Sequence, residues 1–288
     1  VAGMNGKTEY VKVTGPLGEP VICEYGIIES TKTAVIEMAG AAGITQVPDE
    51  KRNPLYTTTY GVGEVIRDAI EKGCRRFIVG IGGSATNDGG MGMLQALGYA
   101  FLDKDGKQVL PGARGLKDIT EITDAYVIPE LAECKFRVAC DVTNPLCGEL
   151  GCSAIYGPQK GATPEMIQDM DQWLGTYAEL AKERFPKADP KYPGTGAAGG
   201  MGFAFLTFTD AVLESGINIV LDETKLEDYI KDADFVITGE GRMDGQTAMG
   251  KAPVGVAKLA KKYGKKVIAF AGAVQRDARA CNDAGIDA

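Results

Sequence analysis

The chain has 288 residues, of which 44% are hydrophobic and 24% are charged, and its formal net charge is −8. This length and composition predict a globular protein of two domains, since a domain typically holds about 100 to 200 residues. No apolar run reaches the roughly 18 residues of a membrane helix, and no basic cluster carries interleaved aromatic residues, so we expect neither a membrane-spanning segment nor a nucleic-acid partner.

Counts of single residue types narrow the chemistry further. The sequence has 0 histidines. Triads with a histidine base and metal sites with histidine ligands are therefore excluded, and a general base has to be Asp, Glu or Lys. The 7 cysteines include no C-x-x-C pair, which argues against zinc and fits free thiols in a reducing compartment. We expect a cytoplasmic protein, and the sequence leaves a homo-oligomer open.

Apolar patterns predict the elements of the first part of the chain. Residues 10–28 and 33–40 alternate in apolar character, with a Gly-Pro turn within the first of these stretches, and predict strands. Residues 58–73 place apolar side chains at helical spacing and end at a glycine, which predicts a helix. Residues 75–83 predict a short buried strand that leads into a glycine-rich loop.

The second part of the chain repeats this alternation of strand and helix. Residues 135–146 predict a strand that ends at Asp141, followed by a turn. Residues 161–185 predict a long helix with Thr163 as its N-cap. Residues 233–272 read as strand, helix and strand, the order of a βαβ unit with parallel strands. The sequence therefore predicts an α/β fold.

Three glycine-rich loops lie at residues 80–92, 194–202 and 239–250. A glycine loop that leads into a helix presents backbone N–H groups and the positive end of the helix dipole, and both favour anions. Glycine also serves tight turns and close packing, so a single loop is weak evidence. Three loops in one chain favour an anion-binding site.

Two of these loops come close to known nucleotide-binding motifs. Gly80-x-Gly82-x-x-Ala85 follows a predicted strand and leaves an NAD(P)-dependent oxidoreductase as an alternative. A Rossmann helix begins at once after such a motif, whereas here the loop continues through polar residues. Residues 245–251 fit G-x-x-x-x-G-K, but Ala252 stands where a P-loop needs the Ser or Thr that holds magnesium.

Carboxylates follow several predicted strands. Four of them lie in or beside a loop just past a strand, where α/β folds place ligands: Asp88, Asp141, Glu240 and Asp244. Each is alternatively a turn or cap residue that binds its own backbone. Phosphoryl transfer needs a metal on the phosphates, cations or amides around them, and a carboxylate that accepts the hydroxyl proton. Lys160, just before the long helix, is either a phosphate contact or a solvated surface lysine.

Several stretches together resemble the bacterial type I glycerate kinase family, in which they recur in the same order: VTGPLGEPV, TAVIEMA, GIGGSATNDGG, VACDVTNPL, GPQKGATPEM, GAAGGMG and VITGEGRMDGQ. They span nearly the whole chain, and GIGGSATNDGG with VACDVTNPL is more specific than any glycine pattern. The resemblance implies ATP-dependent phosphorylation of a hydroxyl of D-glycerate to give a phosphoglycerate, with ATP and Mg²⁺ as cofactors and small molecules as the only partners.

The resemblance also implies a fold. The family has a flavodoxin-like, parallel-sheet α/β domain interrupted by a large inserted α/β domain. Residues 1–224 would be the inserted domain and residues 225–288 a part of the flavodoxin-like one. The family's APDSFK-like and ADGGEGT motifs are missing from the sequence, which begins at Val1 and stops at Ala288. We therefore expect a part of a longer protein, with part of the site missing.

Under this reaction the first candidates for the base and for a metal-side carboxylate are Asp141 and Asp88. Lys160 is a third catalytic candidate, and Asp244 is a second candidate metal ligand beside Asp88. A binding or scaffold module without catalysis remains the other alternative to a kinase, besides the oxidoreductase.

Backbone amides of the first glycine loop are expected to face a phosphate or the glycerate carboxylate. The full set of expected substrate- and phosphate-binding residues is Gly82, Gly83, Ser84, Thr86, Asn87, Gly89, Glu240, Arg242, Asp244 and Lys251.

Overall fold

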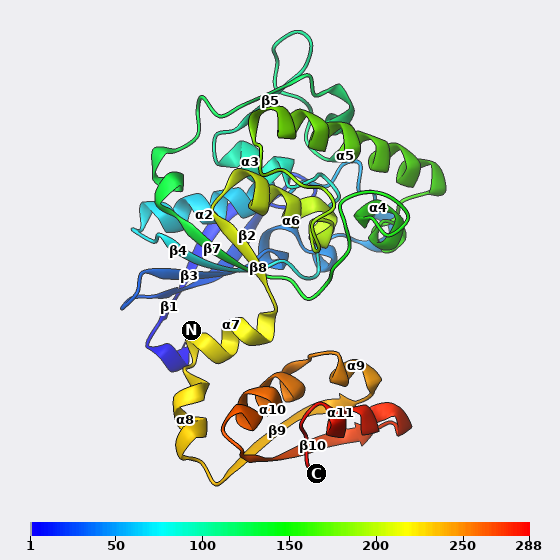
Figure 1. The fold of residues 1–288 in the computed structure, drawn as a ribbon. Helices are drawn as coiled ribbons and strands as arrows, with labels where there is room; N and C mark the ends of the chain where they lie inside the picture. Colours follow the sequence, from blue (N-terminus) through cyan, green and yellow to red (C-terminus); the bar gives the residue numbers. More distant parts are fainter. Residues whose placement is uncertain (1) are drawn as a thin grey trace. The chain divides into compact units, whose positions relative to one another are not determined.

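The structure is a computed structural model that describes residues 2–288, and the expected α/β class is confirmed (Figure 1). The chain forms two compact units, Val1–Glu214 and Ser215–Ala288. The boundary expected from the resemblance lies later, between residues 224 and 225. The assignment of the first unit to an inserted domain and of the second to a flavodoxin-like domain stays a prediction.

A six-stranded sheet forms the centre of the first unit, in the order β1-β2-β3-β4-β7-β8. Its β1–β2 and β2–β3 pairs are antiparallel, and its β3–β4, β4–β7 and β7–β8 pairs are parallel. Strands are confirmed where the sequence predicts them, but β3 ends at Glu37, before the short helix α1 (Ala39–Ala42), and β7 ends at Ala139 rather than at Asp141. Strand β8 was not expected. The bounds are β1 Lys7–Thr14, β2 Pro20–Ile28, β3 Thr33–Glu37, β4 Arg76–Gly80, β7 Lys135–Ala139 and β8 Ala211–Glu214.

One face of this sheet carries the core of the unit. Phe77 on β4 and Phe136 on β7 are buried, and their rings stack with centroids 4.7 Å apart. Val62 and Ile66 of helix α2 (Tyr60–Glu71) belong to the same buried cluster. Figure 1 shows α2 with α3 (Met91–Ala96), α5 (Pro164–Arg184) and α6 (Ala197–Phe208) on one side of the sheet.

The long helix α5 begins as expected, because the Thr163 hydroxyl oxygen accepts a hydrogen bond from the Met166 N–H at 3.3 Å.

Short elements complete the first unit. The remaining elements are the pair β5 Ala100–Leu102 and β6 Glu121–Thr123, the helices α1 Ala39–Ala42 and α4 Cys152–Tyr156, and the 3₁₀ turns Ala2–Met4, Ile44–Gln46, Asp49–Lys51, Ala113–Asp118, Pro129–Glu133 and Pro158–Lys160.

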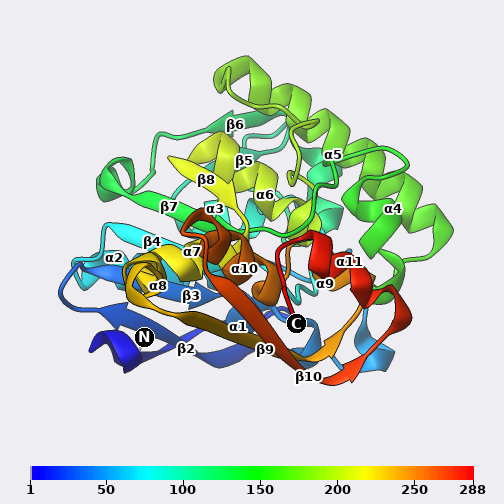
Figure 2. The ribbon, with the colours of Figure 1, turned by 60° about the horizontal axis from the view of Figure 1, so that its bottom comes forward.

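The second unit contains the expected βαβ arrangement. Strands β9 (Phe235–Met243) and β10 (Lys266–Val274) pair in parallel, as Figure 2 shows, and helix α10 (Ala252–Lys262) connects them. Val236, Val254 and Val267 form its small core. Its other elements are α7 Gly216–Glu223, α8 Leu226–Asp232, α9 Gly245–Ala248, the 3₁₀ turn Arg276–Arg279 and α11 Ala280–Asp283.

The parallel strands of the first unit end at one edge of the sheet. Gly80, the last residue of β4, pairs with Glu37 on β3 and with Ala139 on β7. The segments that follow these strands therefore start side by side, at the edge where open α/β sheets bind ligands. This register brings the GIGGSATNDGG loop close to the segment that contains Asp141.

Candidate active site

Asp88, in the middle of the first glycine loop, is fully buried. Its carboxylate accepts hydrogen bonds from the Thr59 N–H and hydroxyl, both at 2.9 Å, and from the N–H groups of Gly90 and Gly92 at 3.2 and 3.3 Å. Burial raises the pKa of this carboxyl, and these hydrogen bonds oppose the rise. Asp88 thus acts as a built-in anion at the start of α2 and α3.

The second glycine-rich stretch packs against the first loop, but Gly199 and Gly200 lie at a non-helical kink inside α6 and not in the separate loop that the sequence predicts for residues 194–202. The Gly89 N–H donates to the Gly199 carbonyl oxygen at 2.9 Å. A Cβ on Gly199 would lie 2.1 Å from the Thr86 carbonyl oxygen, and one on Gly200 would lie 2.6 Å from the Cα of Gly89. Both glycines have positive φ, at 69° and 98°. The two loops therefore need glycine because main chain packs on main chain.

These contacts change the reading of the loop's buried half. The Gly89 N–H already has an acceptor, and the Asp88 carboxylate already has four donors. Thr86 and Asn87 are fully buried, and the Asn87 side-chain amide donates to the Ser153 hydroxyl at 2.8 Å. This geometry argues for structural roles of Asp88 and Gly89 and against the ligand, base and metal roles that the sequence suggests for them. Within the described residues, the Thr86 hydroxyl and the Asn87 side-chain oxygen are buried without a hydrogen-bond partner, so the binding roles expected for these two residues stay predictions.

The exposed half of the loop lines a cavity, which we call the Gly82 pocket. Its volume is about 520 Å³, and it is lined by Ile44, Gly80, Ile81, Gly82, Gly83, Ser84, Ala139, Cys140, Asp141, Val142, Tyr156, Gln159, Lys160, Ala197 and Ala198. A Cβ on Gly82 would meet no atom within 4 Å. Within residues 2–288, the N–H groups of Gly82 and Gly83 find no hydrogen-bond acceptor. These bare amides are available to an anion.

Lys160 forms one wall of the Gly82 pocket and is only 2% exposed. Its ammonium donates to the Ser84 hydroxyl at 2.8 Å and to the Thr86 carbonyl oxygen at 2.5 Å. Burial lowers the pKa of Lys160 to about 8. The surface-lysine alternative does not fit this position, since the residue lies inside the protein and beside the glycine loop.

Asp141 lies in the segment after β7 and is exposed at the Gly82 pocket. The structure thus brings together five of the residues expected from the sequence, namely Gly82, Gly83, Ser84, Asp141 and Lys160. A pocket with one carboxylate, one cation and two bare amides can bind a small anion and accept a proton from it.

Sequence analysis did not find every residue that lines this pocket. Tyr156 and Gln159 flank it, and the Tyr156 hydroxyl donates to the Asn144 side-chain oxygen at 2.7 Å. Ala198 has φ 53° and ψ 40°, an unusual backbone conformation for a residue with a side chain. Tyr156 and Gln159 lie close to Lys160 in the sequence, and this spacing could have indicated that they belong to the same site. Nothing in the sequence indicates the unusual backbone conformation of Ala198.

The second unit holds a polar cavity, which we call the Arg242 pocket. It has a volume of about 530 Å³ and is lined by Arg242, Asp244, Gln246, Lys251, Gln275 and Asp277. The Asp244 carboxylate caps α9 by accepting from the N–H groups of Gln246 and Thr247 at 3.0 and 3.2 Å. It also lies 3.6 Å from the Arg242 guanidinium and 3.8 Å from the Lys251 ammonium.

The other expected residues of this unit are close by. Glu240 accepts a hydrogen bond from the Thr247 hydroxyl, which supports the turn after β9. Lys251 is the N-cap of α10, so its charge stands at the positive end of that helix, where anions are favoured. Arg242 and Lys251 are both exposed. Two cations and a helix N-terminus make this pocket the stronger phosphate candidate of the two.

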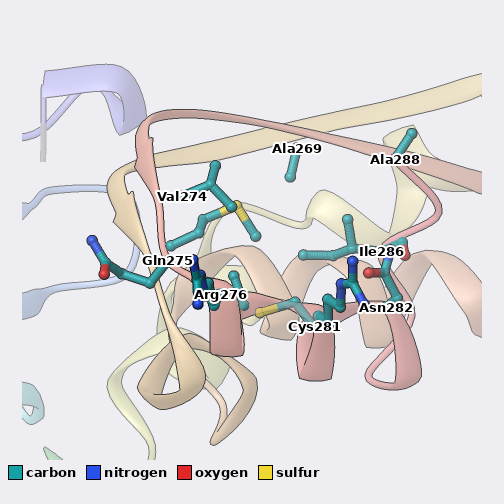
Figure 3. Close-up of a pocket in the computed structure, with 11 residues that line it drawn as sticks. Ala269, Val274, Gln275, Arg276, Cys281, Asn282, Ile286 and Ala288 are labelled. Atoms are coloured by element: carbon teal, nitrogen blue, oxygen red, sulfur yellow. Dashed lines mark hydrogen bonds between the residues drawn. The ribbon is translucent and has the colours of Figure 1, made fainter.

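A more apolar pocket in the same unit contains none of the expected residues. It has a volume of about 520 Å³ and lies between the end of β10 and the segment that holds α11. Figure 3 shows Val274, Cys281 and Ile286 around it. It holds no carboxylate, so it offers no base for phosphoryl transfer.

Among residues 2–288, no helix is long and apolar enough to cross a membrane. No group of three or more Cys, Asp or Glu side chains in this range is arranged to hold a metal ion.

The fold and the pocket are those of an α/β protein with a ligand site at the carboxyl ends of its parallel strands. Comparison with known proteins makes the class specific. The family model described as the glycerate kinase family matches residues 1–288, so the chain belongs to the glycerate kinase family and is a kinase.

Individual relatives agree with this assignment. The chain is 52% identical over 288 residues to the glycerate kinase of Haemophilus influenzae and 49% identical to the glycerate 2-kinase of Escherichia coli K12. It covers 76% of the length of each of these relatives. A crystal structure described as a candidate glycerate kinase 2 from Salmonella typhimurium LT2 is similar with a TM-score of 0.90 and 46% identity, and the match covers 99% of this chain and 80% of that one.

Proposed function

We propose that this protein transfers the terminal phosphoryl group of ATP to a hydroxyl of D-glycerate and releases a phosphoglycerate. The match to the glycerate kinase family supports this reaction. The GIGGSATNDGG and VACDVTNPL stretches support a place in the bacterial type I branch of the family. The 7 cysteines are all free thiols, which supports a reducing, cytoplasmic location.

The observation that carries the proposal is the pairing of Asp141 with the bare amides in the Gly82 pocket. In phosphoryl transfer, a carboxylate accepts the proton of the attacking hydroxyl while other groups hold the substrate. Asp141 is the exposed carboxylate of the pocket, and the chain has no histidine that could do this work. We therefore assign the base to Asp141 and the acceptor substrate to the Gly82 pocket.

The Arg242 pocket is assigned to the phosphates of ATP. Arg242 and Lys251 supply two positive charges toward the phosphates, and Asp244 and Asp277 line the same pocket. Asp244 lies 3.6 Å from the Arg242 guanidinium and 3.8 Å from the Lys251 ammonium, and it caps α9. Glu240 supports the same turn through Thr247. These residues bind and orient the phosphates rather than taking part in proton transfer.

Magnesium fits the Arg242 pocket better than the first glycine loop. Asp88 has four protein donors on its carboxylate and no open side toward a pocket. Asp244 and Asp277 line the Arg242 pocket, and Mg²⁺ needs only one or two carboxylates when phosphates and waters supply its other ligands. These two residues would hold the ion, which neutralises the phosphate charge when bound.

The oxidoreductase alternative is less well supported by the local geometry. A dinucleotide places its pyrophosphate on the helix N-terminus that follows the glycine motif. Here helix α3 begins only at Met91, and the Asp88 carboxylate already accepts from the N–H groups of Gly90 and Gly92 at that position. A pyrophosphate would have to displace a buried carboxylate.

The test is phosphoglycerate formation from ATP, Mg²⁺ and a panel of short hydroxy acids, with the Asp141→Asn variant. We expect D-glycerate to be phosphorylated and kcat of the variant to fall about 10²- to 10⁴-fold, since general bases typically contribute that much. Asp105→Asn, in an exposed turn, is the matched control. A kcat for Asp141→Asn within a few-fold of wild type would remove Asp141 as the base.

A further inference from the structure

Lys160 is a buried cation without an ion-pair partner. Its side chain is 2% exposed, and no carboxylate in the described part of the chain lies within salt-bridge distance of its ammonium. Its two hydrogen-bond acceptors, the Ser84 hydroxyl and the Thr86 carbonyl oxygen, are neutral. Lysines are almost never fully buried unless they are paired, because removing the charge from water is costly. Such a residue in a pocket wall favours binding of an anionic ligand.

The surroundings of Lys160 provide further donors for the same anion. The ammonium has three N–H groups, of which two have protein acceptors. Gly82 and Gly83, in the same pocket, have N–H groups without protein acceptors. Three kinds of donor therefore converge on one cavity: an ammonium, main-chain amides and, through Ser84, a hydroxyl.

Charge indicates which anion this is. Among the described lining residues of the Gly82 pocket, the charged side chains are Lys160 and Asp141. The pocket holds one cation and the bare amides, which suits a ligand with a single anionic group, whereas a polyphosphate would meet the Asp141 carboxylate with little compensation. The Arg242 pocket holds two cations, Arg242 and Lys251, beside two carboxylates that can share a metal ion with phosphates, Asp244 and Asp277.

We propose that Lys160, with Ser84 and the amides of Gly82 and Gly83, binds the carboxylate of the acceptor substrate and thereby restricts acceptors to hydroxy acids. This inference rests on the proposed function, because it assigns the recognition of one group of the proposed substrate. With the carboxylate held there, the hydroxyls of the same molecule remain for Asp141, the base. Polyols and neutral analogues of the same shape lose the interaction with the ammonium.

The titratable groups on α4 beside Lys160 are neutral near pH 7, so they do not compensate the positive charge of its ammonium. Cys152 and Tyr156 lie on α4, Asp88 lies in the buried half of the glycine loop, and Asp141 lines the pocket. Burial raises the pKa of Cys152 to about 11 and raises that of Tyr156 above its usual value. Both are therefore neutral at pH 7, where the ammonium of Lys160 is charged.

The experiment is a thermodynamic cycle in which the Lys160 charge is removed from the protein and the carboxylate charge is removed from the ligand. D-glycerate and its neutral amide, glyceramide, are titrated by calorimetry without nucleotide into wild type, Lys160→Met and the control Lys182→Met, an exposed lysine on α5. We expect wild type and the control to bind glycerate about 100-fold more tightly than glyceramide, as for a buried charge-assisted hydrogen bond. In Lys160→Met the two ligands should bind within about threefold of each other.

Several results would overturn the inference. It fails if Lys160→Met keeps the wild-type preference for glycerate, or if wild type binds both ligands equally or binds neither. The wild-type comparison needs no variant, so it can refute the inference even if Lys160→Met does not fold. ATP affinity, which is assigned to the other unit, and the circular dichroism melting curve of each variant report whether it is folded.

Turnover separates this inference from the proposed function. A protein that prefers glycerate through Lys160 but forms no phosphoglycerate supports the inference and contradicts the kinase proposal for D-glycerate. A protein that phosphorylates glycerate with a KM unchanged by Lys160→Met contradicts the inference alone.

Discussion

Replacing Asp88 by alanine removes the acceptor of four hydrogen bonds, from the N–H and hydroxyl of Thr59 and from the N–H groups of Gly90 and Gly92. A buried donor left without a partner costs about 1 to 3 kcal/mol. Four such donors predict a loss of at least about 4 kcal/mol for Asp88→Ala.

The loss can be followed in the first unit alone. The single tryptophan, Trp173, lies on α5 and packs against the core of that unit, so its fluorescence in a urea titration reports the unfolding there. A unit of this size shifts its Tm by roughly 2 to 4 °C per kcal/mol, which gives a drop of about 8 to 16 °C. Asp141→Asn, at an exposed position, should cost much less stability than Asp88→Ala while losing turnover. The reasoning is refuted if Asp88→Ala is as stable as wild type, and refuted more sharply if it is stable but inactive.

Three further predictions address the loops, the phosphates and the buried lysine. Gly199→Ala should destabilise the first unit by several kcal/mol, because its Cβ would lie 2.1 Å from a carbonyl oxygen. Gly82→Ala should leave the urea midpoint unchanged, because its Cβ would meet no atom within 4 Å. Equal urea midpoints for the two variants would contradict this prediction. Arg242→Gln should raise the KM for ATP several-fold and leave glycerate affinity in calorimetry unchanged, and the reverse pattern would move the phosphates to the other pocket. Burial lowers the pKa of Lys160 to about 8 from 10.5, so the folded state releases its proton before the unfolded chain does. Wild type should therefore gain up to about 3 kcal/mol relative to Lys160→Met as pH rises from 8 to 10.5, and parallel pH profiles of unfolding would show that the lysine is not buried.

Periodic apolar patterns predicted many of the strands and helices, because burial on one face of an element is a local property of its sequence. They missed α6, which begins in an expected glycine loop, and strand β8. The strand before Gly80, the cap at Thr163 and the parallel pair of the second unit follow from such patterns. The carboxyl edge of the sheet as a place for ligands also follows, since parallel strands end on the same side.

Sorting the residues of that edge required tertiary contacts. Gly83 and Gly89 look alike in the sequence, but Gly89 donates to Gly199, which is remote along the chain, while Gly83 faces a pocket. The role of Asp88 depends on Thr59, which precedes it by a whole helix and strand. No local pattern encodes such pairs, because they form only when the loops pack on one another.

The sequence also could not decide whether Lys160 is buried or exposed. Its context in the sequence allowed either a phosphate contact or a solvated side chain. Its burial comes from the Pro158–Lys160 turn, which directs the side chain toward Ser84 and Thr86. Only the resulting position, charged and unpaired in a pocket wall, points to an anion.

The central claim is that the acceptor acid binds in the Gly82 pocket of the first unit. A crystal structure of the protein soaked with D-glycerate tests it most directly. The account predicts the carboxylate within hydrogen-bond distance of the Lys160 ammonium and a hydroxyl within reach of the Asp141 carboxylate. Glycerate bound at another site, with the amides of Gly82 and Gly83 still bare, would contradict it.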